Sequence, residues 1–228
     1  SAKYRSACSS PSDDGNPPTS PIRFRRPGNP INGRRMAERL ATRSRRRDKL
    51  RSVSPDDVVE LIMRRPGPTR LVAIDGPGGA GKSTYAEHLA AAAGGAPVIH
   101  TDDFASADNR IDWWPRPLAE VVEPLVSGAS ARFRRYDWST RSLAEWITVD
   151  PAPIVIIEGV SSGRSEWARH LSFVVWIETP RELRLARGLE RDGPDAVGDW
   201  EGWMDGEDSF YARDPVRARA DLVIDGTA

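Results

Sequence analysis

The feature that most constrains this chain is a glycine-rich stretch between an apolar run and an alanine-rich segment, residues 71–90 (LVAIDGPGGAGKSTYAEHLA). Residues 76–83 fit the pattern G-x-x-x-x-G-K-[ST] without a mismatch. The apolar run suits a buried parallel strand, and the segment from Lys82 suits a helix. Strand, glycine loop and helix in this order predict a loop that binds phosphate groups through its backbone N–H donors.

Each position of this loop has a chemical reason. Glycines allow positive φ, so consecutive N–H groups can point at one anion, and the start of a helix adds partial positive charge. Lys82 is predicted to reach the β- and γ-phosphates, Ser83 to coordinate Mg²⁺, and Thr84 to lie near the α-phosphate. The alternative is a glycine-rich turn without a ligand. The loop residues predicted to bind the nucleotide are Gly76, Gly78, Gly79, Ala80, Gly81, Lys82, Ser83 and Thr84.

Lysine usage supports this interpretation. The chain has 33 basic residues, but its only lysines are Lys3, Lys49 and Lys82. Arginine is therefore the default cation. A lysine kept in the loop indicates that a compact ammonium group is needed there and that a planar guanidinium would not replace it.

The two parts of the chain carry opposite charge. Residues 1–53 contain 14 basic and 4 acidic residues, a net of +10, and the whole chain contains 33 of each kind, so residues 54–228 carry −10. Because the leading segment is rich in Pro, Ser and Arg and poor in apolar residues, we expect it to be a largely disordered extension with a short helix around 34–50. Its charge suits nucleic acid, another acidic surface, the acidic remainder of the chain, or solvation alone.

Composition also excludes several classes of protein. The chain has no apolar run near the roughly 18 residues of a membrane span and lacks the apolar core of a signal peptide. Cys8 is the only cysteine, which excludes an intrachain disulfide and a thiolate metal site. His88, His100 and His170 show no ligand spacing, so none is assigned to a metal. We expect a cytoplasmic protein.

Beyond the loop, apolar runs alternate with helical patterns. Ser54 followed by Pro55 predicts a capped helix, and further helices are expected to about Ala93, after the Trp/Pro-rich stretch 112–125, and over 180–193 and 198–213. Such alternation predicts an α/β fold in which helices cover both faces of a parallel sheet and ligands bind at the carboxyl ends of the strands. The strands are expected at 71–75, 97–100, 132–138, 154–158, 173–178 and 221–225.

Acidic residues at the ends of predicted strands indicate which reaction the phosphate loop supports. Asp102 and Asp103 follow one strand, and Glu158 ends another. A carboxylate at this edge can accept a proton from an attacking hydroxyl, and one beside the phosphate loop can hold a Mg²⁺-bound water. The metal shell is therefore assigned to Ser83 and Glu158. The alternatives are a helix cap formed by the aspartate pair and a plain strand-end acid.

Three arginines recur at helical spacing after the fifth predicted strand. Arg184, Arg187 and Arg191 share one helix face, and the stretch DGPD at 192–195 follows as a hinge. Together they predict a small lid whose guanidinium groups bind the transferring phosphoryl group. The alternative is a solvated arginine face paired with neighbouring glutamates.

With these pieces in place, the chain resembles the uridine kinase family of P-loop nucleoside kinases and, more loosely, phosphoribulokinase and bacterial-type pantothenate kinase. The resemblance runs from about residue 70 to 227 and rests on IDGPGGAGKST, HTDDF, NRIDWWPRPL, RRYDWSTRS, VIIEGV, RELRLARGLERD and ARADLVIDG. It implies that Asp102 is the general base and that the three arginines belong to a lid. It also implies that Asp112 holds the ribose hydroxyls and that Tyr136 lies beside the nucleobase with Arg141 nearby.

The chain departs from the family pattern in the segments that handle the acceptor. Residues 139–141 (Ser-Thr-Arg) occupy the stretch where the family has a histidine, residues 112–115 read Asp-Trp-Trp-Pro instead of Asp-His-Pro, and Ala105 replaces a tyrosine. Trp113 is assigned to the acceptor, because an indole can stack on a planar base. The alternative for Trp113 is packing in the core.

The combined prediction is a kinase that uses ATP (or GTP) and Mg²⁺ to phosphorylate the 5′-hydroxyl of a pyrimidine nucleoside. Asp102 is the predicted base, and Lys82, Arg187 and Arg191 stabilise charge. One alternative is a phosphotransferase for another hydroxylated metabolite or natural product. Another is a nucleotide-dependent regulatory protein whose basic tail binds nucleic acid. The resembled family forms dimers and tetramers, so a homo-oligomer is expected as well.

Overall fold

The computed structural model describes residues 53–106, 109 and 111–227, and this part of the chain folds around a parallel sheet. The sheet has five strands in the order β2-β5-β1-β6-β7, and every neighbouring pair is parallel. The predicted α/β class is therefore confirmed. The predicted basic extension, its helix and Cys8 lie outside the described residues. The strands are β1 (Arg70–Asp75), β2 (Val98–His100), β5 (Ile154–Glu158), β6 (Leu171–Glu178) and β7 (Leu222–Asp225).

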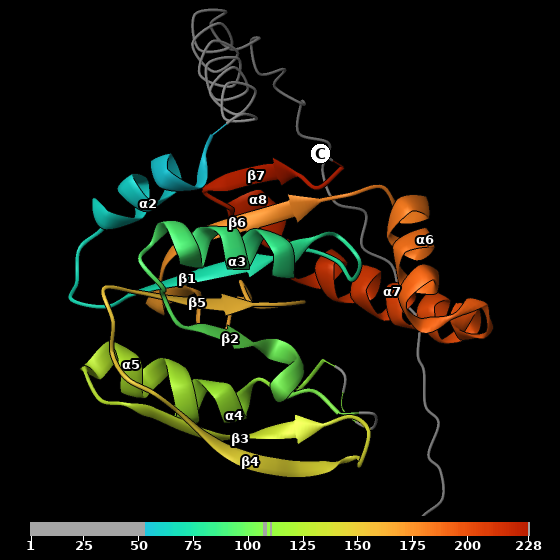
Figure 1. Cartoon of the computed structure of the whole chain (residues 1–228), viewed down its shortest axis with the longest axis horizontal. Coiled ribbons are helices and arrows are strands. Elements are labelled where there is room, and N and C mark those ends of the chain that lie inside the picture. The colour runs from blue at the N-terminus through green and yellow to red at the C-terminus, as the bar shows by residue number, and fades with distance from the viewer. Residues whose placement is uncertain (1–52, 107–108, 110, 228) are drawn as a thin grey trace, which may run out of the picture. The chain divides into compact units, whose positions relative to one another are not determined.

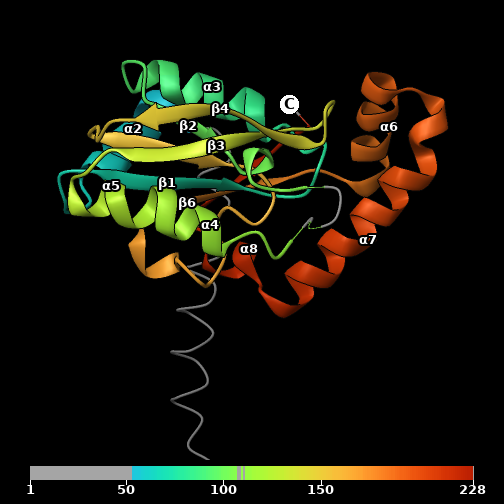
Figure 2. The same cartoon turned by 90° about the horizontal axis from the view of Figure 1, so that it is seen from below.

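Helices cover both faces of this sheet (Figures 1 and 2). On one face, α2 and α3 pack against Val72 and Ile74 of β1. On the other face, Leu71 packs with the α4–α5 segment and Ala73 packs with α7 and α8. Because side chains alternate along a strand and both faces are buried, β1 is apolar almost throughout. The α-helices are α2 (Pro55–Met63), α3 (Lys82–Ala92), α4 (Pro115–Pro117), α5 (Glu123–Ser127), α6 (Arg181–Asp192), α7 (Val197–Arg213) and α8 (Val216–Arg219).

Shorter helical segments connect these elements. A π-helix, η2 (Leu118–Val122), joins α4 to α5, so the Trp/Pro-rich stretch leads into a helix as predicted. The other short segments are the 3-10 turns η1 (Thr101–Asp103), η3 (Ala168–His170) and η4 (Pro194–Ala196). Within the described ranges, no helix is both long and apolar enough to cross a bilayer.

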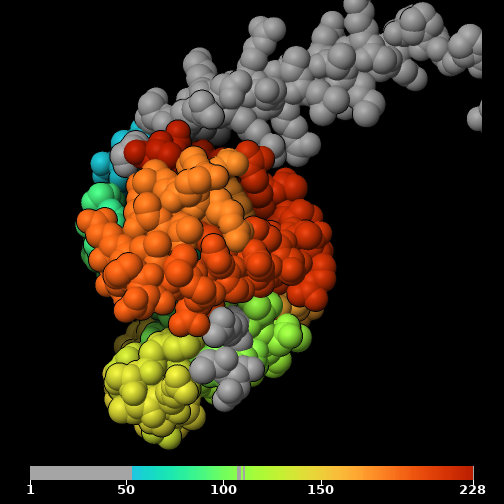
Figure 3. All heavy atoms as spheres, turned by 90° about the vertical axis from the view of Figure 1, so that its right-hand side faces the viewer, coloured from blue at the N-terminus to red at the C-terminus, as the bar shows by residue number. Residues whose placement is uncertain are grey.

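Two appendages frame the carboxyl ends of the strands. An antiparallel hairpin joins β3 (Ala131–Asp137) to β4 (Ser142–Val149), and α6 and α7 form the lid, toward which the arrowheads of the parallel strands point (Figure 1). Seen from that end, the atoms of the lid lie above those of the hairpin (Figure 3). The first hairpin strand agrees with the predicted strand at 132–138, whereas β4 is a finding of the structure.

Candidate active site

The phosphate loop connects β1 to α3 as the sequence predicts. Gly76, Gly79 and Gly81 have φ of 144°, 74° and 97°, values that side chains other than hydrogen rarely tolerate. At Gly79, a Cβ atom would also collide with the backbone of the lid helix α6. A backbone of this kind gathers N–H donors around an anion, and α3 begins directly at Lys82.

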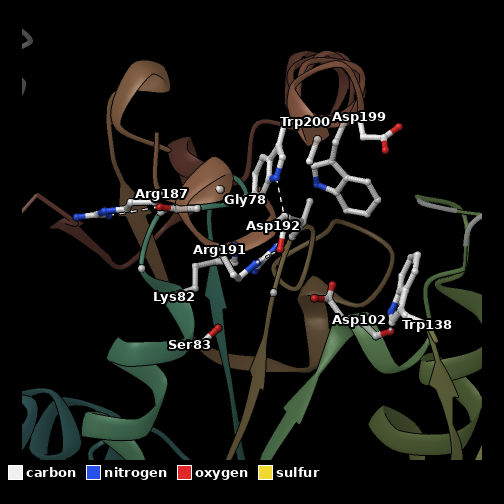
Figure 4. Close-up of a pocket in the computed structure, with 18 of the residues that line it drawn as sticks. Gly78, Lys82, Ser83, Asp102, Trp138, Arg187, Arg191, Asp192, Asp199 and Trp200 are labelled. Carbon is white, nitrogen blue, oxygen red and sulfur yellow. Dashed lines mark hydrogen bonds and ion pairs between the residues drawn. The ribbon is translucent and has the colours of Figure 1, made fainter. Parts of the chain in front are cut away.

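A pocket of about 810 Å³ lies over this loop and under the lid. Its size falls within the roughly 300–1,000 Å³ typical of small-molecule sites. Figure 4 shows Asp102 and Trp138 on one side of it and Arg191 and Trp200 on the other. The lining includes these predicted site residues: Gly78, Gly79, Ala80, Gly81, Lys82, Ser83, Thr84, Asp102, Arg141, Glu158, Arg187 and Arg191. It also includes Trp138, Asp192, Asp199, Trp200 and Trp203, none of which was assigned to the site from the sequence.

Two cations of the pocket, Lys82 and Arg187, are held by hydrogen bonds to backbone carbonyls. The side chain of Lys82 is 7% exposed, and its Nζ donates to the Pro77 carbonyl at 2.9 Å. Arg187 donates to the carbonyl of Gly79 at 3.3 Å and to that of Gly226 at 2.9 Å, so it ties α6 to the loop. A hydrogen-bonded ammonium beside a phosphate loop is placed to neutralise phosphate charge.

The guanidinium of Arg191 is held in place by its neighbours. It forms two hydrogen bonds with Asp192, at 2.7 and 2.8 Å, and lies 5.5 Å from the centre of the Trp200 ring. The indole N–H of Trp200 donates to the same carboxylate at 2.9 Å. The Asp192 hydrogen bond raises the pKa of Arg191, so the group stays cationic and keeps its planar face near the pocket.

Ser83 and Glu158 lie together as the predicted metal shell requires. The Ser83 hydroxyl donates to Glu158 Oε1 at 3.3 Å, and Glu158 Oε2 lies 2.8 Å from His100 Nδ1. Hard oxygen atoms of this kind suit Mg²⁺, which takes most of its other ligands from phosphates and water. Within the described part of the chain, no group of three or more His, Cys, Asp and Glu side chains forms a metal site of its own.

His100 is a neighbour of the site that the sequence did not assign. Its hydrogen bond to Glu158 raises the pKa of the imidazole, against the opposite effect of burial. Its position as the last residue of β2, just before Asp102, was the only available signal. The carboxylate of Glu158 is therefore oriented from both sides, by Ser83 and by His100.

Of the two aspartates after β2, Asp102 lines the pocket and Asp103 does not. The pKa of the Asp102 carboxyl is raised, chiefly by desolvation, although nearby Lys82 acts in the opposite direction. The Asp102 carbonyl accepts a hydrogen bond from the Trp138 indole at 3.1 Å. The 3-10 turn and this indole therefore fix the aspartate at the hairpin side of the pocket, where a general base is expected.

The residues predicted to hold the acceptor are only partly brought together. Arg141 lines the pocket from the hairpin turn, where its φ is 51°. Asp112 and Tyr136 are not among the lining residues. The ring of Tyr136 contacts that of Trp138 edge-on, with centroids 5.3 Å apart, so Tyr136 reaches the pocket only through this neighbour.

The structure places Trp113 in the core. Its side chain is 5% exposed and packs against Phe104 and Trp167, with ring centroids 6.4 and 6.0 Å away. The guanidinium of Arg164, which is 2% exposed, lies 5.7 Å from the Trp113 ring centre. These contacts favour the packing alternative over stacking on an acceptor, since an indole enclosed in this way presents no free face.

Trp113→Ala is therefore expected to lower the free energy of unfolding by about 3–5 kcal/mol, because it removes a large buried side chain and leaves a cavity. Urea denaturation measures the effect. The control is Trp146→Ala: this side chain is 56% exposed and stacks on Arg132, so its loss should cost about 1 kcal/mol or less. Equal small costs for both variants would contradict the packing role.

Arg184 differs from the other two lid arginines. It is predicted to bind the nucleotide, but its side chain is only 5% exposed and does not line the pocket. It donates to the carbonyl of Thr179 at 3.1 Å and pairs with Glu207 at 3.4 Å. Arg187 and Arg191 line the pocket, whereas Arg184 is held behind the loop by these contacts.

Asp75 and Glu207 are buried acids that the sequence did not identify. Asp75, at the end of β1, accepts hydrogen bonds from the backbone of Gly76 at 2.6 Å and Gly163 at 2.7 Å and from the Tyr211 hydroxyl at 2.7 Å. Burial raises the pKa of the Asp75 carboxyl and also that of Glu207. Both acids hold the base of the loop from outside the pocket.

The parallel sheet and the phosphate loop at the carboxyl end of β1 define an α/β P-loop protein. Residues 100–209 match the model of the phosphoribulokinase/uridine kinase family, so this part of the chain is similar to that family. This match begins after the phosphate loop, so it supports the resemblance independently of the loop motif. The family resemblance inferred from the sequence is therefore confirmed.

A similar protein of known name points to the same family. The chain is 34% identical over 73 residues to a probable uridine-cytidine kinase of Caenorhabditis elegans. The match covers 32% of this chain and 29% of that protein, less than a third of its length.

Two solved structures share the fold. A possible uridine kinase from Bacillus stearothermophilus superposes with a TM-score of 0.56 at 21% identity, covering 75% of this chain and 97% of that one. A putative fructose transport system kinase from Silicibacter sp. superposes with a TM-score of 0.57 at 20% identity, covering 76% and 99%. At this level of identity they support the P-loop fold.

Proposed function

We propose that the protein is a kinase that transfers the γ-phosphoryl group of ATP, or GTP, to a hydroxyl group of a small molecule with the help of Mg²⁺. The observation that carries the proposal is the convergence of a phosphate loop, a hydrogen-bonded serine–carboxylate pair suited to a metal ion, and an aspartate at the end of β2 on one pocket. Phosphoryl transfer needs positioning and charge neutralisation more than covalent chemistry, and this pocket supplies both.

Each residue then has a role. The loop and Lys82 hold the phosphates, and Ser83 with Glu158 holds Mg²⁺, which when bound neutralises charge on the phosphate oxygens. Asp102 accepts the proton of the attacking hydroxyl. The guanidinium groups of Arg187 and Arg191 stabilise the charge of the transferring group from the lid.

For the acceptor, we propose a pyrimidine nucleoside phosphorylated on its 5′-hydroxyl. The support comes from the relative named a probable uridine-cytidine kinase and from the hairpin side of the pocket. There, Trp138 offers a ring face next to Asp102, and Arg141 offers hydrogen-bond donors. A flat base with exocyclic oxygen atoms fits such a pair.

Another hydroxylated metabolite is the second candidate acceptor. Asp112 and Tyr136, which the resemblance assigns to ribose and base, do not line the pocket, and Trp113 is buried. One structural neighbour is described as a putative fructose transport system kinase. A sugar or sugar-like alcohol is therefore included in the test.

The proposed function is tested by coupled ADP release with ATP and Mg²⁺ against uridine, cytidine, fructose, pantothenate, ribulose 5-phosphate and simple aminosugars. Turnover with uridine or cytidine supports the nucleoside acceptor, and turnover with another compound supports the second candidate. ATP binding without turnover on any compound of the panel, under conditions where the protein is folded, would contradict the proposed acceptor classes. Failure to bind ATP would contradict the kinase itself.

Glu158→Gln is expected to raise the Mg²⁺ concentration that gives half-maximal turnover by about ten- to a hundredfold, because a metal-shell carboxylate loses its charge. A Mg²⁺ titration at saturating ATP measures the shift. His100→Gln serves as the comparison: it removes only the partner of the carboxylate and should shift the titration less. An unchanged Mg²⁺ requirement in Glu158→Gln would remove Glu158 from the metal shell.

Contact of the basic tail with nucleic acid, a cytoplasmic location and self-association stay predictions. The tail lies outside the described residues.

A further inference from the structure

The N–H and the carbonyl of Gly78, which belong to two successive peptide groups of the phosphate loop, are both held by one buried ion pair. The N–H donates to Glu207 Oε1 at 2.9 Å, and the carbonyl accepts from Arg184 Nη1 at 3.4 Å. Arg184 and Glu207 also pair with each other at 3.4 Å, with side chains 5% and 1% exposed. We call these two residues the loop clamp.

The loop clamp joins the loop to both lid helices. Arg184 comes from α6, where its Nε also donates to the Thr179 carbonyl at 3.1 Å, and Glu207 comes from α7. The Trp203 side chain provides a further hydrogen bond to Glu207. A Cβ atom at Gly78 would lie 2.9 Å from Glu207 Oε1 and 3.3 Å from the Trp200 ring, so a side chain there would displace the Glu207 carboxylate or the indole. The ion pair and the indoles of Trp200 and Trp203 therefore pack closely against the Gly78 backbone and favour a single conformation of the loop.

Neither member of the loop clamp lines the pocket. Glu207 holds the Gly78 N–H from outside the pocket, and Arg184 partly neutralises its charge. Gly78 itself lines the pocket, as do Gly79 and Ala80 after it. Because the N–H and the carbonyl of Gly78 are both hydrogen-bonded to the loop clamp, the first pocket-lining residues of the loop are held in place.

We infer that Arg184 and Glu207 are positioning residues that preorganise the phosphate loop for ATP and couple it to the lid. This inference rests on the proposed nucleotide-binding function of the loop. A loop already ordered before binding loses less conformational freedom when the ligand arrives. A buried ion pair is by itself a poor source of stability, because desolvation offsets the attraction. This ion pair, however, forms hydrogen bonds with both the N–H and the carbonyl of Gly78, which an apolar pair could not do.

The experiment separates positioning from stability. Glu207→Leu alone leaves the Arg184 charge buried without its partner and is expected to unfold at a lower temperature. The double variant Arg184→Met/Glu207→Leu replaces the whole pair with apolar side chains of similar length, which is often neutral for stability. Glu201→Gln, an exposed glutamate on the same helix, is the matched control. ATP affinity is measured by calorimetry without acceptor, well below each unfolding temperature.

We expect the double variant to unfold near the wild-type temperature but to bind ATP at least about tenfold more weakly, a loss of about 1.4 kcal/mol. Glu201→Gln should bind ATP like the wild type. Wild-type or tighter affinity in a folded double variant would overturn the positioning role. If the wild type itself bound no ATP, and Lys82→Ala changed nothing, the proposed function would fail and this inference with it.

Discussion

Lys82→Ala is expected to lower kcat by roughly a thousandfold without unfolding the protein, the cost typical of removing one preorganised charged donor at a reacting group. Lys82 is 7% exposed and lines the pocket, and its ammonium group is held by the loop itself through the Pro77 carbonyl. When phosphate enters, this donor can move from the carbonyl to a phosphate oxygen at little cost. Single-turnover phosphoryl transfer at saturating ATP measures the loss directly.

Lys82→Arg is the informative control for charge. Its guanidinium keeps the positive charge but is planar and larger, so we expect it to restore little of the lost rate. Thermal unfolding of both variants checks that the loop and α3 still form. If the alanine variant turned over within tenfold of the wild type, Lys82 would not be stabilising the transferring group.

The parallel sheet could be predicted because its signals are local. Strands buried on both faces appear as short apolar runs, and the predicted strands at 71–75 and 154–158 agree with β1 and β5 within one residue. The start of α2 is equally local. Ser54 accepts from the Asp57 N–H at 3.2 Å and the Asp57 carboxylate accepts in return from the Ser54 N–H at 3.3 Å, a cap contained within four residues.

The strand β4 could not be predicted in the same way. All eight of its residues are exposed or only partly buried, so its sequence shows no clear apolar alternation. Its turn also lacks the usual signal. Arg141 takes the left-handed conformation there, with φ of 51°, at a place where hairpins commonly use glycine or asparagine. Asp137 stabilises the turn by accepting from the Ser139 and Thr140 N–H groups, at 2.8 and 3.3 Å.

The site residues also differ in whether local sequence could predict them. The loop motif places Gly76 to Thr84 in one continuous segment, and its chemistry follows from spacing. The residues that support the loop are distant in sequence: Glu207 lies 129 positions from Gly78, and no pattern around it marks it as different from the other acids of α7. Only the packing of α7 against the loop selects it. Arg184 could be predicted to share a helix face with Arg187, but not to be the buried member.

Two tryptophans show that residue type alone does not predict whether a side chain lies in the core or in the pocket. Trp113 and Trp138 have the same side chain, and both follow an aspartate in segments that resemble acceptor-binding motifs. The structure buries Trp113 in the aromatic core and leaves Trp138 42% exposed at the pocket. The difference comes from the partners: Arg164 and Trp167 enclose Trp113, and the hairpin turn carries Trp138 into the pocket. The contacts of neither tryptophan could be predicted from the sequence, because each contacts residues that are distant along the chain.

Asp102→Asn is expected to lower kcat/KM for the acceptor by about 10²–10⁴-fold, the usual contribution of a general base. The amide has the same shape and keeps the backbone contact to Trp138, so the fold and ATP binding should persist. Steady-state kinetics with the acceptor found in the panel measures the loss, and calorimetry checks ATP binding. Asp103→Asn is the matched control, since Asp103 neighbours the base but does not line the pocket, and it should keep turnover near the wild type.

The pH profile identifies the base more specifically than the rate alone. Desolvation raises the pKa of Asp102 above its ordinary value of 3.8. The carboxylate form, which accepts the proton, is present above the raised pKa and is lost as pH falls through it, so kcat/KM should fall on the acid side at a higher pH than an exposed aspartate would give. In Asp102→Asn, the residual activity should lose this acid limb, because the titrating group is gone. An acid limb unchanged in the asparagine variant would assign the titration, and the proton transfer, to another group.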